Sequence, residues 1–177
     1  MARQSPYQPS LLRLLHGLSA LVLFGAATSG YWIYEQFDGR WGKLGLPMID
    51  NVMGLHHTIG EFATVLMLLF VLYSLTLGRR KLVQLSSLKQ LVQPTHPAWW
   101  NSLHRLTNTF IMGAAILAVV SGKRMEGRWL ANEEFDQLPY LLHLSAWSAI
   151  GIGLILHLLM NLKIGGVPLL MSIFPSG

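Results

Sequence analysis

Histidines are the residues of this 177-residue chain that are best suited to chemistry. There are seven of them and no cysteine, which excludes thiolate nucleophiles, iron–sulfur ligation and covalent attachment of a c-type haem. His143 and His157 stand 14 residues apart within one apolar stretch. On a helix, fourteen residues rise about 21 Å and return to within roughly 40° of the starting direction. Both imidazole rings are therefore expected to project from the same face of a single helix, near its two ends.

Two more histidines fall at matching depths on other apolar stretches. His16 stands near the start of the first stretch, and His56 near the start of the second, which must run in the opposite direction. Depth therefore pairs His16 with His157. By the same reasoning, His56 is paired with His143. Two stacked pairs of neutral imidazoles suit a flat, large and apolar ligand, and haem b meets that need because its iron accepts one imidazole nitrogen from each face.

Other chemistries fit these histidines less well. A zinc site would need four ligands close together. A di-iron carboxylate bundle would need several glutamates, whereas Glu61 is the only carboxylate within an apolar stretch. A proton relay would not require matched depths. Four glycines beside or between the histidines would leave room for a porphyrin face or for close contact between helices: Gly17, Gly60, Gly151 and Gly153.

The elements that must position these side chains are membrane-spanning helices. Hydrophobic residues make up 52% of the chain and charged residues only 12%, about half the charged fraction of an ordinary soluble domain. Hydrocarbon offers the backbone no hydrogen-bond partners, so an apolar segment of roughly 20 residues crosses it as a helix. Four stretches are long enough: residues 11–34, 52–77, 103–121 and 138–162. The expected fold class is all-α, a transmembrane four-helix bundle forming one domain over residues 1–177.

The charges of the connecting segments orient this bundle. The N-terminal arm, residues 78–105 and the tail after residue 162 carry eight cations and no acid, whereas the other two loops carry five cations and seven acids. The positive-inside rule therefore places both termini in the cytoplasm, and a bacterial-type inner membrane is the expected location. The net charge of +5 is explained by topology and lipid rather than by nucleic acid.

Two further features concern the ends of the spans. The first span also resembles a cleaved signal peptide, with Arg3 and Arg13 as its basic region, but Arg13 and His16 interrupt its start and the apolar run is long, so we expect it to be retained. Six aromatic residues fall near predicted span ends, as in an interfacial belt: Tyr31, Trp32, Trp99, Trp100, Trp129 and Tyr140.

Several of these residues resemble the motifs of a known family. The run R-L-L-H at 13–16 resembles an R-x-x-H opening, and S-G-Y at 29–31 a T-G-Y-like close of the first helix. The run H-H-T-I-G at 56–60 resembles H-x-x-x-G, and the 14-residue spacing resembles the last helix. Over nearly its whole length the chain resembles the bacterial cytochrome b561 family of di-haem membrane cytochromes b. It is also similar to the b-type anchor subunits of hydrogenases, formate dehydrogenases and thiosulfate reductases.

The resemblance implies two non-covalent haem b groups, one held by the first and fourth helices and one by the second and fourth. Carried over residue by residue, it gives two pairs of iron ligands: His16 with His157, and His56 with His143. His56 has the family's distance to the glycine and is preferred over His57, which points about 100° away. The chain departs from the family at Gly17, where Trp is common, and at Ser172, where Arg is frequent.

The resemblance further implies electron transfer between a donor and the quinone pool. Two imidazoles per iron leave no open coordination site, so such haems pass single electrons. Family members include one that oxidises superoxide and reduces quinone. Two alternatives stay open: a haem-bearing anchor subunit of a larger hydrogenase- or dehydrogenase-type complex, with partner subunits or a second copy of the chain, and a haem-free membrane scaffold or assembly factor. Whether the chain is itself an oxidoreductase also stays open.

Charged residues and further histidines near the spans provide other candidates. Cations at span ends suit haem propionates, although topology explains them equally well: Arg13, Arg105 and Lys163 inside, and Lys123 and Arg124 outside. Glu61, one turn after His57, would relay protons for quinone chemistry or hydrogen-bond to His57 or a facing helix. His104 is a second candidate for the quinone site, and His96 is expected in a solvated loop.

Overall fold

The structure, a computed structural model, describes residues 10–125, 135 and 137–172. Its helices are α1 (Ser10–Ile33), continued by a π-helical turn η1 (Tyr34–Asp38), then α2 (Val52–Leu75), the short 3₁₀ turn η2 (Arg79–Lys81), α3 (Leu85–Leu91), α4 (Trp99–Met125) and α5 (Leu138–Met171). No strand occurs among these residues. Four of the helices are long and apolar enough to cross a membrane, which confirms the all-α prediction of four spans.

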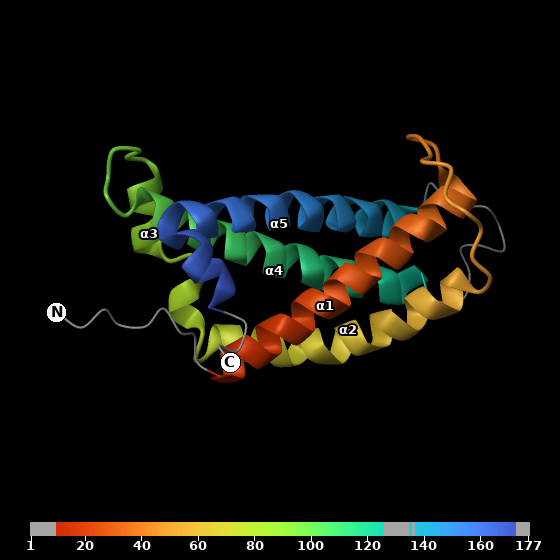
Figure 1. The fold of residues 1–177 in the computed structure, drawn as a ribbon, viewed down its shortest axis with the longest axis horizontal. Helices are drawn as coiled ribbons and strands as arrows, with labels where there is room; N and C mark the ends of the chain where they lie inside the picture. The colour runs from red at the N-terminus through yellow and green to blue at the C-terminus, as the bar shows by residue number, and fades with distance from the viewer. Residues whose placement is uncertain (1–9, 126–134, 136, 173–177) are drawn as a thin grey trace.

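The four long helices form two antiparallel pairs, with α1 packed along α2 and α4 along α5, while α2 also contacts α4. Helix α1 begins and α5 ends at the same end of the bundle (Figure 1), which we name the α3 end after the short helix that stands there. The opposite end is named the cavity end. The structure contains no bilayer, so the cytoplasmic location of the termini stays a prediction.

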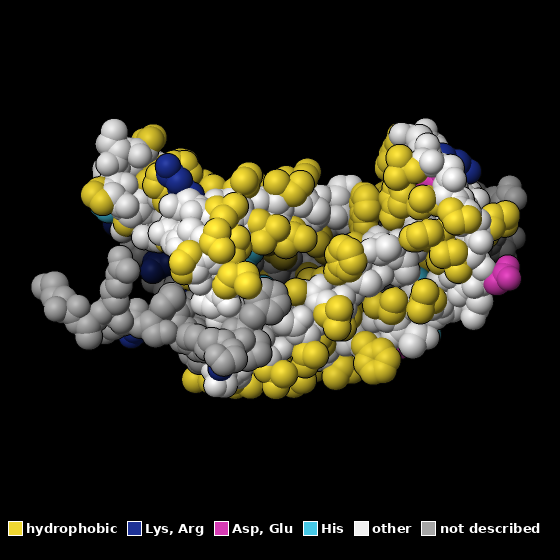
Figure 2. All heavy atoms as spheres, in the orientation of Figure 1, with side chains coloured by type: hydrophobic (Ala, Val, Ile, Leu, Met, Phe, Trp, Pro, Cys, Tyr) yellow, Lys and Arg dark blue, Asp and Glu magenta, His cyan; other side chains and the backbone are white. Residues whose placement is uncertain are grey.

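Small side chains form the contacts between these helices. Buried positions include Ser19, Ser29, Ala115, Ser121 and Ala146, whose short side chains allow the close backbone approach that stabilises helix pairs in lipid. Large apolar side chains instead point outward over α1, α2 and α5, as Figure 2 shows. This distribution is the reverse of a soluble core and is expected of a surface solvated by acyl chains.

The helices differ from the predicted spans at their ends. Helix α4 exceeds the predicted 103–121 by four residues on each side, and α5 continues to Met171, although Gly166, with a φ of 64°, and Pro168 break its regular helix. The predicted loop 78–102 contains α3. The aromatic residues predicted at span ends, from Tyr31 to Tyr140, stand in the first or last turns of the helices. Trp129, Arg3, Arg128 and the acids Glu126, Glu133, Glu134 and Asp136 lie outside the described residues.

The first helical stretch also continues past its predicted end, through η1. It thereby includes Glu35, which is 4% exposed and accepts hydrogen bonds from the backbone N–H groups of Leu44, Gly45 and Leu46 at 2.9, 2.6 and 3.2 Å. By sequence, this carboxylate was predicted only as a charge of the loop after the first span. In the structure, the hydrogen bonds of Glu35 hold the loop after η1 against the cavity end of the bundle.

Candidate functional site

The structure brings the four predicted ligands together in the predicted pairs. The ring centroids of His16 and His157 are 6.0 Å apart, and those of His56 and His143 are also 6.0 Å apart. One member of each pair comes from the α1–α2 pair of helices and the other from α5. A metal held by two imidazole nitrogens at about 2 Å each would place ring centres about 6 Å apart. Both pairs therefore have the spacing that a six-coordinate iron needs.

Hydrogen bonds orient the rings at the cavity end. The Nδ1 of His143 lies 2.8 Å from the carbonyl oxygen of Ala118, and a carbonyl can only accept. The Nδ1 of His56 lies 2.9 Å from the hydroxyl of Ser29, whose own proton is donated to a carbonyl one turn back in α1. In both rings Nδ1 is thus the protonated nitrogen, which leaves a lone pair on Nε2 for a metal.

The α3 end uses an amide for the same purpose. The Nδ1 of His157 donates to Oδ1 of Asn108 at 2.8 Å, and the Nδ2 of Asn108 donates to the carbonyl of Lys81 at 3.1 Å. The second bond fixes the orientation of the amide, so its oxygen faces the imidazole. Asn108 was not predicted from the sequence, although a polar amide inside an apolar span is a signal of function.

A third imidazole lies beside this pair. The ring of His104, from α4, is 5.0 Å from that of His157. Its Nε2 is buried and has no hydrogen-bond partner among the described residues. His104 was predicted as a quinone contact; the structure places it next to a predicted iron ligand and leaves the quinone role a prediction.

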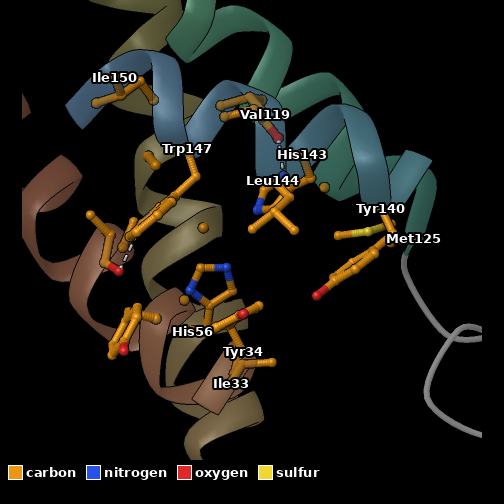
Figure 3. A pocket seen from close by; sticks show the side chains of 18 of the residues that line it. Ile33, Tyr34, His56, Val119, Met125, Tyr140, His143, Leu144, Trp147 and Ile150 are labelled. Atoms are coloured by element: carbon orange, nitrogen blue, oxygen red, sulfur yellow. Dashed lines mark hydrogen bonds between the residues drawn. The ribbon is translucent and has the colours of Figure 1, made fainter. Parts of the chain in front are cut away.

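A cavity of about 790 Å³ opens between the helix pairs at the cavity end. His56 and His143 point into it from opposite sides (Figure 3). Most of the other lining side chains are apolar, and five are aromatic: Tyr31, Tyr34, Trp41, Tyr140 and Trp147. The volume lies in the range of cofactor sites, and the apolar lining with few polar groups suits a macrocycle.

Two further glycines make room for the rings of this cavity: Gly30, which belongs to the S-G-Y motif, and Gly122, which was not singled out from the sequence. A Cβ at Gly30 would lie 3.2 Å from Cε1 of His56, and one at Gly122 would lie 3.2 Å from Cε1 of His143. Of the four predicted glycines, Gly60 lines the cavity. A Cβ at Gly17, Gly60 or Gly151 would meet nothing within 4 Å among the described residues, whereas one at Gly153 would lie 2.7 Å from Ile111 in α4, so it serves helix contact.

Charged groups gather at the edge of the cavity. Glu61 forms an ion pair with Lys123 of α4, and its Oε1 lies 3.7 Å from Nε2 of His57. All three side chains are about half exposed and line the cavity. Glu61 therefore contacts both predicted partners, His57 and a facing helix. Lys43, from the loop after α1, lines the same cavity and was not singled out as a propionate candidate, whereas the predicted Arg124 does not line it.

The predicted cations at the α3 end have contacts within the protein. Arg105 donates to the hydroxyl of Ser87 at 3.4 Å, and Arg13 donates to that of Ser10, also at 3.4 Å. The ammonium of Lys163 lies 5.4 Å from the centre of a Trp100 ring. Their role toward propionates stays a prediction. His96 is half-buried in a turn before α4, where its Nδ1 accepts the N–H of Ala98 at 3.0 Å.

The donor set suits a ligand that brings its own equatorial nitrogens. Within the described part of the chain, no group of three or more His, Asp or Glu side chains is placed to hold a metal ion. A bare metal would therefore lack ligands, whereas haem needs only two axial imidazoles from the protein. The ring spacings, the free Nε2 atoms and the cavity all fit haem b.

Comparison with known proteins finds a matching family model. A family model described as "Prokaryotic cytochrome b561" matches residues 7–175, which includes all four spanning helices. No curated protein and no solved structure matches the chain. The evidence from relatives is thus at the level of the family.

Replacing Gly122 by alanine tests the fit of His143 against α4. The added methyl group would crowd Cε1 of the ring, which offsets the gain in helix propensity of up to about 1 kcal/mol. Gly113→Ala in the same helix is the matched control, because its methyl group would meet open space among the described residues. We expect Gly122→Ala alone to lower the melting temperature and alter the haem absorbance. Equal melting temperatures and identical spectra for the two variants would contradict this fit.

Substitution of Asn108 tests the hydrogen bond to His157. In Asn108→Leu the imidazole loses its acceptor, so we expect haem at this pair to be retained about 10- to 100-fold less tightly and its midpoint potential to rise. Asn108→Asp offers a stronger acceptor, which makes the ligand more basic and should lower the potential. Both variants lose the bond to Lys81, so the opposite shifts isolate the effect on the imidazole. Redox titration measures them, and shifts in the same direction would contradict the assignment.

Proposed function

The chain belongs to the prokaryotic cytochrome b561 family, and from that premise we propose that it is a di-haem cytochrome carrying electrons across the membrane between a donor and the quinone pool. Membership makes it a multi-pass membrane b-type cytochrome that works in electron transfer. The observation that carries the finer proposal is the presence of two imidazole pairs, each with ring centroids 6.0 Å apart, in one bundle.

The protein's part in this function is to provide two imidazoles that would hold each haem. His56 and His143 would bind one haem, and His16 and His157 the other, each through Nε2. Where Nδ1 donates to an oxygen, as in His143 and His157, the ring is held in place and its basicity is raised, which stabilises the ferric state. When bound, such a haem supplies one-electron transfer. Two imidazoles holding each haem would leave no position at which oxygen could bind.

Helix α5 sets the distance between the two sites. It contributes His143 to one pair and His157 to the other, and the helix rise separates them by about 21 Å. Because both residues lie before the break at Gly166, this spacing is that of a regular helix. If both termini are cytoplasmic, as the loop charges predict, the cavity end faces the outer side. The two sites then form a path across most of the membrane.

The cavity edge supports quinone as the partner in electron transfer. Reduction of a quinone consumes protons as well as electrons, so its site needs a group that can pass a proton. Glu61 is a half-exposed carboxylate at the edge of the apolar cavity, beside Lys123 and His57. A quinone could approach this edge from the lipid. Glu61 would pass the proton to the quinone, while its ion pair with Lys123 would hold the carboxylate at the cavity edge.

Haem counting in double variants tests the pairing. His16→Ala combined with His157→Ala removes both ligands of one site, so we expect about one haem per chain. His16→Ala combined with His143→Ala damages both sites and should leave almost none. His96→Ala is a control that should keep both haems. Haem extraction with protein quantification gives the ratio, and equal haem content in the two double variants would overturn the pairing.

A second set of variants tests Glu61. Glu61→Gln removes the ionisable carboxylate, and we expect quinone reduction to slow by roughly 100-fold, the lower range for a positioned acid–base group, with unchanged haem spectra. Glu61→Asp keeps the carboxylate and should retain most of the rate. Lys123→Met breaks the ion pair but keeps the Glu61 carboxylate. It therefore shows whether the rate of quinone reduction depends on the carboxylate itself or on its ion pair. Stopped-flow measurements of quinone reduction decide, and a normal rate in Glu61→Gln would make Glu61 structural.

A further inference from the structure

Helix α3 lies against the first three turns of α4, at the end of the bundle opposite the cavity (Figure 1). Hydrogen bonds join the two along their length. The indole of Trp99 donates to the carbonyl of Leu91 at 3.1 Å, and the backbone N–H of Val83, just before α3, donates to Oγ1 of Thr109 at 2.9 Å. Residues 83–91 thus run beside residues 99–109 of a membrane-spanning helix, rather than projecting away from the bundle.

The two faces of α3 differ in character. The face toward α4 is polar and paired: Ser87 is fully buried and accepts from Arg105, and Gln90 accepts from the hydroxyl of Ser102 at 2.5 Å. The opposite face carries apolar side chains at the i, i+3, i+7 positions of a helix: Leu85, Leu88 and Val92, which are 81%, 48% and 81% exposed. The usual pattern of a surface helix is reversed.

Exposed cations lie close to this apolar face along the chain. Arg79, Arg80 and Lys81 form η2, just before α3, and Lys89 lies on α3 itself. The sequence between Glu61 and Glu126 contains no Asp or Glu, so no nearby acid in the sequence neutralises them. An apolar helix face flanked by basic groups, at the end of a membrane span, has the chemistry of a peripheral membrane helix. In water the cations would be well solvated, but exposure of the three apolar side chains would cost free energy.

We infer that α3 and η2 form a binding site for anionic phospholipids. The apolar face of α3 lies in the boundary between headgroups and acyl chains, and the four cations contact the phosphates. Long Arg and Lys side chains reach the headgroups from beside an apolar face, as Lys89 must. The occupant is lipid rather than protein because the face lies beside a spanning helix, within reach of the bilayer surface, and its charge complements that surface.

Spin labels on single cysteines test where this face lies, and the chain needs no preparation because it has no native cysteine. The test uses the full chain in vesicles of phosphatidylglycerol and phosphatidylcholine. At Leu88→Cys, a label should collide with oxygen, which concentrates in lipid, more than with an aqueous nickel chelate. At Thr95→Cys, an exposed position in the following turn, the order should reverse. Equal nickel access at both sites, or shielding of the Leu88→Cys label from both reagents, as under a protein partner, would overturn the proposal.

Lipid retention tests the role of the cations. After purification from a membrane containing both lipids, the chain should retain several-fold more phosphatidylglycerol than phosphatidylcholine, relative to their abundance. The triple variant Arg79→Gln, Arg80→Gln and Lys89→Gln should lose this enrichment, while the charge-conserving Lys89→Arg should keep it. Circular dichroism and the label at Leu88→Cys verify that the triple variant is folded. Unchanged enrichment in a folded triple variant would overturn the site.

Discussion

An imidazole inside a membrane must satisfy two nitrogens without water, and the rest of the structure depends on how it does so. In His56, His143 and His157 one nitrogen is satisfied by a hydroxyl, a carbonyl or an amide. The other is left facing a second imidazole across an apolar gap. A poorly solvated nitrogen is costly in hydrocarbon, so we expect binding of a metal there to stabilise the arrangement. The family to which the chain belongs binds b-type haem.

The packing of the helices keeps this gap open. Helices α1 and α2 pack on each other, as do α4 and α5, whereas α5, which carries one ligand of each pair, meets α1 through long side chains such as Trp147, whose indole donates to the carbonyl of Ala27 at 3.1 Å. Small residues draw each pair of helices together, while glycines beside His56 and His143 allow the rings to lie against a neighbouring helix. A planar ligand would complete the contact between the two halves. Binding of haem and final packing of the bundle are thus expected to be one event.

Features set by helix geometry could be predicted from the sequence. Hydropathy located the four spans, and the fixed rise and turn of a helix placed His143 and His157 on one face at two depths. Features that depend on lateral packing could not be predicted. Asn108 meets His157 across 49 residues, and Gly122 meets His143 across a helix pair whose rotation is set by many small contacts. Helix α3 escaped prediction because seven residues of mixed character give no period that distinguishes them from a loop. Glu35 was missed because its partners are backbone groups, which no residue type reveals.

The most direct measurement of the central claim is magnetic circular dichroism of the oxidised, purified protein, combined with electron paramagnetic resonance. These methods report the axial ligands and the spin state of each ferric iron. We expect low-spin iron throughout, with two imidazole ligands at every haem. High-spin iron, a ligand other than imidazole, or a colourless protein from cells supplied with ample haem would contradict it.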